Sequence, residues 1–274
     1  MRKKRWWILL LILVVMAVFA LDERLTLRTY TVESPKLTAE VRLAVVADFH
    51  SSDNPDEVAT MVASCAPDAV LFVGDLFDDD TANRPTERTL SLMRQLSAQY
   101  PCYYVSGNHE AWTGEMDALY QQTEDAGVKV LRMSSDVLTV RGQRIALCGV
   151  PDPYEMVFSG APETEEQLRL ALESVDSADF TVLLAHRPEL LTKYAQYPFD
   201  LVLSGHAHGG QVRIPGLLNG LYAPNQGWFP KLAGGTYAQD GTTMIVSRGL
   251  AVRTGLPRIF NRPEVVLVRC VPAE

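Results

Sequence analysis

Cysteine is scarce in this sequence: 4 of the 274 residues are cysteines, and no two of them have C-x-x-C spacing. This scarcity argues against a zinc knot and against a disulfide scaffold, which both need closely spaced cysteines. Cys65, Cys102, Cys148 and Cys270 lie in apolar segments. Free cysteine is among the residues most often buried, so we expect four core thiols.

Positive charge is also limited. The chain has 25 Lys and Arg residues against 33 Asp and Glu residues, a net charge of −8. Four of the basic residues stand at positions 2–5, and the remainder, with 21 basic and 33 acidic residues, carries −12. A body this acidic repels a polyphosphate chain, which argues against a protein that coats DNA or RNA. It remains compatible with a small phosphorylated substrate held through a metal ion.

Long apolar runs are absent except at the N-terminus, where residues 6–21 carry no charge and follow the basic cluster. As a helix this run is about 24 Å long, somewhat short of a hydrocarbon core of about 30 Å. Trp6 and Trp7 suit a headgroup interface, and the basic residues favour a cytoplasmic start. We expect an uncleaved single-pass membrane anchor with the rest of the chain extracytoplasmic. The alternative is a secretory signal cleaved near Ala20.

No internal repeat, low-complexity tract or linker divides the rest of the chain. We therefore expect three parts: an anchor or signal at 1–21, a connecting segment with a first strand at 22–40, and one α/β domain at 41–274. Strands are predicted at 42–47, 69–73, 102–105, 145–149, 181–185, 200–203, 243–247 and 264–270, and helices at 54–65, 85–99, 111–126 and 162–175. The strand segments are apolar on both faces, which is typical of sheets covered on both sides.

Histidine is rare as well, and each of the five histidines follows an apolar strand pattern or lies in a glycine-flanked turn. They occur in the motifs Asp48-Phe49-His50, Gly107-Asn108-His109-Glu110, Ala185-His186 and Gly205-His206-Ala207-His208, and Gly74-Asp75 follows another strand in the same way. In an extended segment positions i and i+2 share a face, so Asp48 and His50 could bind one ion. Side chains at the ends of several strands converge at one edge of an open α/β sheet.

Two carboxylates, one amide oxygen and several imidazoles are thus expected at one site. This mixture of nitrogen and oxygen donors suits Mn, Fe or Zn better than Mg. The donors are too many for one tetrahedral ion and sufficient for two ions that share a carboxylate. Each motif alone is also compatible with an ordinary turn or a core histidine, and only their conjunction predicts a metal centre.

The ordered series D-x-H (48–50), G-D (74–75), G-N-H-E (107–110), H (186) and G-H-A-H (205–208) resembles the calcineurin-like metallophosphoesterases over about residues 40–270. The stretches GGQVRIPG, APNQGWFPK, VSRGL and FNRPE, within 209–263, resemble a membrane-associated bacterial branch that includes phosphodiesterases and hydrolases of UDP-2,3-diacylglucosamine. The resemblance implies a four-layer αββα sandwich with two metal ions at its strand ends.

The resemblance also implies a role for each motif residue. One ion would be held by Asp48, His50, Asp75 and His208, and the other by Asp75, Asn108, His186 and His206, so that Asp75 bridges them. His109 would face the substrate and stabilise the transition state or protonate the leaving oxygen. The family often has Asp at the next position; here Glu110, a longer side chain, could still orient the His109 ring.

These features predict a dinuclear-metal hydrolase of phosphodiester or pyrophosphate bonds that uses a metal-activated hydroxide. The expected substrate is small and phosphorylated or lipid-linked, such as a UDP-diacylglucosamine-like compound of lipid metabolism. The membrane is a further expected partner, and no nucleic acid is expected. The oligomeric state is left open. The alternatives are an inactive metal-binding scaffold of the same fold and, among enzymes, a phosphomonoesterase, a protein phosphatase or a nuclease.

Other residues carry weaker signals. The acidic run 78–80 could form a third cation site, but a solvated loop is the favoured interpretation. Arg187, Arg248 and Arg253 could clamp substrate phosphates or form structural salt bridges, and Arg248 is the candidate we retain. The apolar pairs 217–218 and 228–229 could receive an acyl chain or simply pack within their loops.

Overall fold

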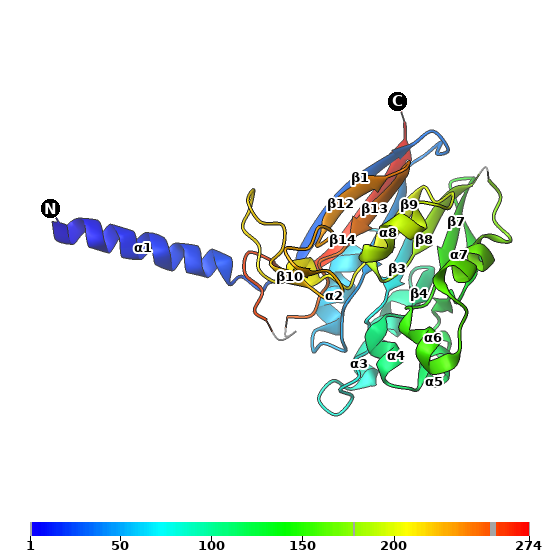
Figure 1. Ribbon diagram of the computed structural model, residues 1–274, viewed down its shortest axis with the longest axis horizontal. Helices are drawn as coiled ribbons and strands as arrows, with labels where there is room; N and C mark the ends of the chain where they lie inside the picture. The colour runs from blue at the N-terminus through cyan, green and yellow to red at the C-terminus, as the bar shows by residue number, and fades with distance from the viewer. Residues whose placement is uncertain (1, 178, 253–255, 274) are drawn as a thin grey trace.

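The structure is a computed structural model that describes residues 2–177, 179–252 and 256–273 (Figure 1). Its first sheet has the strand order β1-β14-β2-β3-β4-β5. These strands are β1 (Thr26–Ser34), β14 (Glu264–Pro272), β2 (Val41–Val46), β3 (Ala69–Val73), β4 (Cys102–Val105) and β5 (Lys129–Val130). Strands β2 to β5 are parallel, whereas β14 runs antiparallel to β2 and parallel to β1. The carboxyl ends of β2, β3 and β4 therefore meet at one edge.

The second sheet has the order β12-β13-β9-β8-β7-β6. Its strands are β12 (Gly235–Gln239), β13 (Thr242–Val246), β9 (Leu201–Ser204), β8 (Phe180–Leu184), β7 (Gln143–Gly149) and β6 (Ser134–Val140). The four central strands are parallel, and the two edge strands are antiparallel to their neighbours. A short pair, β10 (Tyr222–Ala223) and β11 (Gly227–Trp228), lies in the loop before β12.

Alternation along the strands places one apolar face between the sheets and the other under helices. In β2, Leu43 and Val45 belong to the core between the two sheets, whereas Ala44 and Val46 belong to the core under the helices. In β8, Leu184 likewise faces the first sheet and Leu183 faces outward. This explains why the sequence of these strands is apolar on both faces.

Helices cover the outer face of each sheet. The first sheet is covered by α2 (Pro55–Ser64), α3 (Thr86–Ser97) and α5 (Met116–Asp125), and the second by α7 (Thr164–Leu172) and α8 (Leu191–Tyr194). The short helices α4 (Asn108–Trp112), α6 (Tyr154–Ser159), η1 (Pro188–Leu190) and η2 (His208–Gly210) lie in loops. The expected mixed α/β fold with two sheets is confirmed.

One prediction about local structure needs correction. The helix expected at 111–126 is two helices, α4 and α5, because the chain turns at Gly114, whose φ of 71° lies in the left-handed region that glycine adopts without strain. The four cysteines, in contrast, are buried and free, as predicted.

The N-terminal helix α1 (Arg2–Ala20) extends away from the sheets (Figure 1). Among the described residues no helix has both the length and the apolar character needed to span a membrane. Basic residues take up the first turn of this 19-residue helix, and its uncharged remainder is shorter than a hydrocarbon core of about 30 Å. The expected transmembrane helix, and the single-pass membrane location inferred from it, are therefore wrong.

Candidate metal centre

The predicted metal-ligating residues come together at the edge where the parallel strands of both sheets end. Asp48 and His50 follow β2, Asp75 follows β3, Asn108 begins the helix after β4, His186 follows β8, and His206 and His208 follow β9. Their side chains are buried, with exposed fractions of 6% or less. Seven residues that are far apart in the sequence thus enclose one space between the two sheets.

The potential ligand atoms form two groups that share Asp75. In one group, atoms of Asp48, His50, Asp75 and His208 lie within 4.8 Å of one another; in the other, atoms of Asp75, His186 and His206 do. The Asp75 Oδ2 atom is 3.0 Å from His186 Nε2 and 3.8 Å from His50 Nε2. A shared carboxylate between two donor groups is the arrangement expected for two neighbouring ions.

Several atoms of this cluster have no hydrogen-bond partner among the described residues. They are Asp48 Oδ2, His50 Nε2, Asp75 Oδ2, Asn108 Oδ1, His186 Nε2 and His208 Nδ1. A buried polar atom without a partner costs about 1–3 kcal/mol, so six in one place need a common partner. Carboxylate, amide and imidazole donors together suit transition-metal ions, and the residues present therefore fit a divalent metal centre.

Hydrogen bonds to neighbouring segments leave one atom of Asp48, Asp75 and His186 for the centre. Asp48 Oδ1 accepts the His206 backbone N–H at 2.9 Å, and Asp75 Oδ1 accepts that of His109 at 2.9 Å, so each Oδ2 stays available. The His186 Nδ1 atom lies 2.9 Å from the Val73 carbonyl oxygen. A ring that donates from Nδ1 carries its lone pair on Nε2, the atom directed at Asp75.

The backbone of the cluster is strained. Asp48, His50, Asp75, His206 and His208 have φ values of 53°, 48°, 52°, 66° and 46°, in the left-handed region that residues other than glycine rarely adopt. Such conformations concentrate at functional sites, where the surrounding structure holds them. The expectation that residues 48–50 are extended is thus wrong, because β2 ends at Val46 and the chain turns to aim both side chains at the centre.

Close packing requires glycine at two positions around the cluster. Gly249, with a φ of 71°, approaches Asp48 so closely that an added Cβ atom would lie 2.6 Å from the Asp48 Cβ atom. Gly74, with a φ of 76°, lies against the His186 ring, which an added Cβ atom would overlap. Any larger residue at these positions would displace a side chain of the centre.

Two buried carboxylates, those of Asp48 and Asp75, shape the electrostatics of the cluster. Burial raises the pKa of the Asp48 carboxyl to about 6. Burial alone would lower the pKa of His186, but the nearby Asp75 carboxylate outweighs this effect and raises the pKa to about 10. The carboxylates thus favour a positive charge in their midst, which is the electrostatic requirement for holding cations.

The acidic run 78–80 is not simply a solvated loop, and this prediction is corrected. The Asp78 side chain is buried and its Oδ2 atom lies 3.0 Å from His50 Nδ1 and 3.2 Å from Arg84 Nη1. The Asp79 Oδ1 atom lies 2.6 Å from His109 Nδ1. Sequence reasoning missed both contacts, although the run begins three residues after the Gly-Asp motif and could have been placed at the same edge.

Glu110 does not contact the His109 ring, contrary to the expected orienting role, which Asp79 takes instead. Its two carboxylate oxygens accept the backbone N–H groups of Asp75, Leu76, Phe77 and Gly107 at 2.7–3.1 Å. The side chain is fully buried, and burial raises its pKa to about 7, with a further rise caused by the Asp75 charge. Glu110 therefore holds the loop that carries Asp75.

We predict that Glu110→Ala lowers the free energy of unfolding by about 3–5 kcal/mol, because it leaves buried N–H groups without an acceptor. Urea denaturation followed by circular dichroism measures this change. Glu124→Ala, on an exposed face of α5, is the matched control and is expected to change stability by less than about 0.5 kcal/mol. Equal stability of both variants would contradict the role given to Glu110.

The arginines considered as phosphate clamps have other contacts. Arg187 is buried and pairs with Asp152, with Nη2 3.0 Å from Oδ1, and it also contacts Asn225. The Asn225 Oδ1 atom lies 2.8 Å from His206 Nε2, so this pair sits behind a residue of the cluster. Arg248 is buried and its Nε atom donates to Glu264 Oε2 at 2.6 Å. Arg253 lies outside the described residues.

Comparisons with known proteins agree with this geometry. The family profile described as calcineurin-like phosphoesterase matches residues 41–210. The chain therefore belongs to the calcineurin-like phosphoesterase family, and it is a metal-dependent phosphoester hydrolase. This matched segment contains all seven residues of the cluster.

The sequence identity to individual relatives is low. The chain is 28% identical over 227 residues to the uncharacterized metallophosphoesterase YkuE of Bacillus subtilis, covering 82% of this chain and 75% of that protein. It is 29% identical over 209 residues to the phosphodiesterase YaeI of Escherichia coli, covering 75% and 71%. The crystal structure of TT1561 of Thermus thermophilus superposes with a TM-score of 0.53 at 14% identity, covering 78% of this chain and 92% of that one, which shows a shared fold.

Proposed function

We propose that this protein hydrolyses phosphodiester or pyrophosphate bonds at a centre of two divalent metal ions. The observation that carries the proposal is the pair of donor groups that share Asp75, with their unpartnered atoms directed at one space. We assign one ion to Asp48, His50, Asp75 and His208, and the other to Asp75, Asn108, His186 and His206. When bound, such ions would offset the charge of the phosphate oxygens and lower the pKa of a water, so that hydroxide is available to attack phosphorus at neutral pH.

His109 is the residue we assign to the substrate. It is adjacent to Asn108, and its side chain is 26% exposed, unlike the buried ligand candidates. Its Nδ1 atom is held by Asp79 at 2.6 Å, which fixes the ring and leaves Nε2 to exchange a proton with the leaving oxygen. His50 and His109 rings are 4.3 Å apart, so the proton donor stands beside the metal cluster.

The proposal extends to the substrate class and to the identity of the metal ions. The acidic surface favours a small phosphorylated compound over nucleic acid, and the resemblance makes a UDP-diacylglucosamine-like lipid a candidate to assay. The ions are proposed to be Mn, Fe or Zn because nitrogen and oxygen donors are mixed. An inactive scaffold is disfavoured because the cluster and His109 are all present.

Metal removal tests the proposal. We expect the purified full-length protein to contain about two divalent ions per chain by elemental analysis, and to hydrolyse bis(4-nitrophenyl) phosphate. Chelation and dialysis are expected to lower the rate about a hundredfold or more, and Mn to restore it. Hydrolysis of 4-nitrophenyl phosphate alone would indicate a phosphomonoesterase, and undiminished activity after metal removal would overturn the proposal.

A further inference from the structure

A cavity lies outside the candidate metal centre and has no role in the reaction described above. It has a volume of about 430 Å³ and is lined by three arginines and an apolar wall. The arginines are Arg28, Arg213 and Arg248, and the wall includes Ile214, Leu217 and Phe260. Among the described residues that line this cavity none is acidic, although the chain as a whole carries a net charge of −8.

Two of the three guanidinium groups, those of Arg28 and Arg248, pair with a carboxylate, and it is the same one, that of the fully buried Glu264. Arg248 Nε is 2.6 Å from Glu264 Oε2, whereas Arg28 Nε is 4.0 Å from the same atom. Arg213 instead donates to neutral groups, the Gly209 carbonyl oxygen at 3.2 Å and the Asn219 side chain. One carboxylate cannot offset three guanidinium charges, so the cavity keeps an excess of about two positive charges.

The excess of positive charge affects the pKa of an arginine in the cavity. Burial, and then the charge of Arg248, lower the pKa of Arg213, although a guanidinium keeps its charge at neutral pH. Partly buried cations repel one another, and an anion that enters between them lowers their free energy. Phosphate fits this role well, because its oxygens accept the paired N–H groups of arginine.

Other residues that line the cavity are apolar and exposed. The Leu217 side chain is 82% exposed and that of Ile214 is 44% exposed. Removing such apolar surface from water stabilises a complex. A ligand that matches both walls is therefore an anion that carries a hydrocarbon portion.

Two loops connect this cavity with the metal cluster. Gly249, which follows Arg248, packs against Asp48, and the Ala251 N–H donates to the Asp48 carbonyl oxygen at 2.8 Å. Gly209, whose carbonyl Arg213 contacts, follows His208 directly. An anion bound in the cavity thus stands next to the loops that hold the catalytic centre.

We propose that this cavity binds a phosphate-type anion with an apolar chain, as a subsite for a second anionic group of the substrate. The subsite role rests on the proposed function, whereas anion binding itself does not. Arg28 and Arg213 bind the anion, Arg248 supports Arg28 through their shared partner Glu264, and Leu217 and Ile214 cover the chain. The substrate class that follows is an amphiphilic phosphodiester or pyrophosphate with more than one negative group.

Calorimetric titration with octyl phosphate tests the proposal on the full-length protein. We expect Arg213→Gln and Arg28→Gln each to weaken binding about tenfold, since each removes one charge-assisted contact. Arg141→Gln, which removes an exposed arginine that pairs with Asp68, is the matched control and is expected to bind as the unaltered protein does. Arg28 is more than half exposed, so its replacement keeps the test valid if Arg213→Gln does not fold.

Further arms separate the sources of binding. We expect octyl phosphate to bind Asp75→Asn as tightly as the unaltered protein; loss of binding in that variant would place the anion at the metal centre and overturn the proposal. If inorganic phosphate binds as tightly as octyl phosphate, the proposed contact with an apolar chain is overturned. If octyl glucoside binds as tightly, the proposed preference for an anion is overturned. Binding of octyl phosphate without hydrolysis of the diester would support anion binding in the cavity and overturn the proposed function. Hydrolysis without this binding would overturn anion binding in the cavity and leave the proposed function intact.

Discussion

Asp75→Asn is expected to lower kcat/KM for bis(4-nitrophenyl) phosphate by about 10³-fold or more. The residue belongs to both donor groups, with Oδ2 3.0 Å from His186 Nε2 and 3.8 Å from His50 Nε2. Asparagine has nearly the same shape but no charge, so the centre loses the carboxylate that both ions would share. A thousandfold change corresponds to about 4 kcal/mol of transition-state stabilisation.

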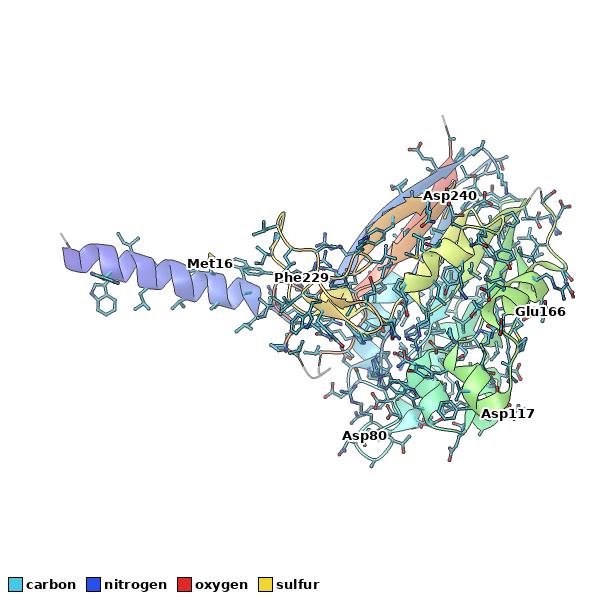
Figure 2. The ribbon with its side chains drawn as sticks, viewed as in Figure 1. Met16, Asp80, Asp117, Glu166, Phe229 and Asp240 are labelled. Atoms are coloured by element: carbon cyan, nitrogen blue, oxygen red, sulfur yellow. The ribbon has the colours of Figure 1, made fainter. Side chains whose placement is uncertain are left out.

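The same substitution should reduce the bound metal, which elemental analysis after gel filtration measures independently of activity. The Asp75 Oδ1 contact with the His109 N–H at 2.9 Å can be kept by the asparagine oxygen, so we expect the fold to persist. Asp240→Asn is the matched control, because Asp240 lies in an exposed turn (Figure 2) and also has a positive φ, of 50°. Full metal content and activity in Asp75→Asn would refute the assignment of a shared carboxylate.

The gathering of this cluster could be predicted because strand ends are readable in the sequence. Runs such as residues 69–73 and 181–185 are short, apolar and followed by Gly-Asp or His, and the parallel strands that they form end at one edge. The position of a ligand candidate therefore depends on strand order more than on loop geometry. This is why residues separated by up to 160 positions, Asp48 and His208 among them, could be brought to one site from the sequence.

The loop contacts around the cluster could not be predicted in the same way. Glu110 binds four backbone N–H groups from two loops, and no sequence pattern records which amide a buried carboxylate will meet. Asp78 and Asp79 look like a solvated acidic run until the loop brings them against His50 and His109. Hydrogen bonds between segments depend on the tertiary arrangement of both partners, whereas strand patterns depend on local periodicity.

The N-terminal segment differs from its prediction for another reason. Residues 6–21 carry no charge, and this composition predicts a membrane span. As a helix, however, the run is shorter than the hydrocarbon core of a bilayer. Length and hydropathy have to be satisfied together by the helix that forms, and α1 contains the basic residues in its first turn. The local prediction of a helix is correct, and the inference from it to a membrane span is not.

His109→Ala is expected to lower kcat by about 10²–10⁴-fold on a diester with a poor leaving group, such as a phenyl ester, while metal content stays unchanged. The reason is that phenolate needs a proton as it departs, whereas 4-nitrophenolate is a stable anion and needs less help. The loss should therefore be smaller on bis(4-nitrophenyl) phosphate. A role in holding metal would instead lower both rates equally and reduce the bound ions.

Asp79→Asn separates the positioning of His109 from its chemistry. Since Asp79 Oδ1 holds His109 Nδ1 at 2.6 Å, we expect a loss in kcat of about tenfold with little change in KM, and a further substitution of His109 should make the effect of Asp79 disappear. Asp80→Asn is the matched control, because Asp80 lies in the same loop (Figure 2) and bonds to Asn83 instead. Additive losses in the double variant would show that Asp79 acts through some group other than His109, and the substrate-facing dyad would then have to be abandoned.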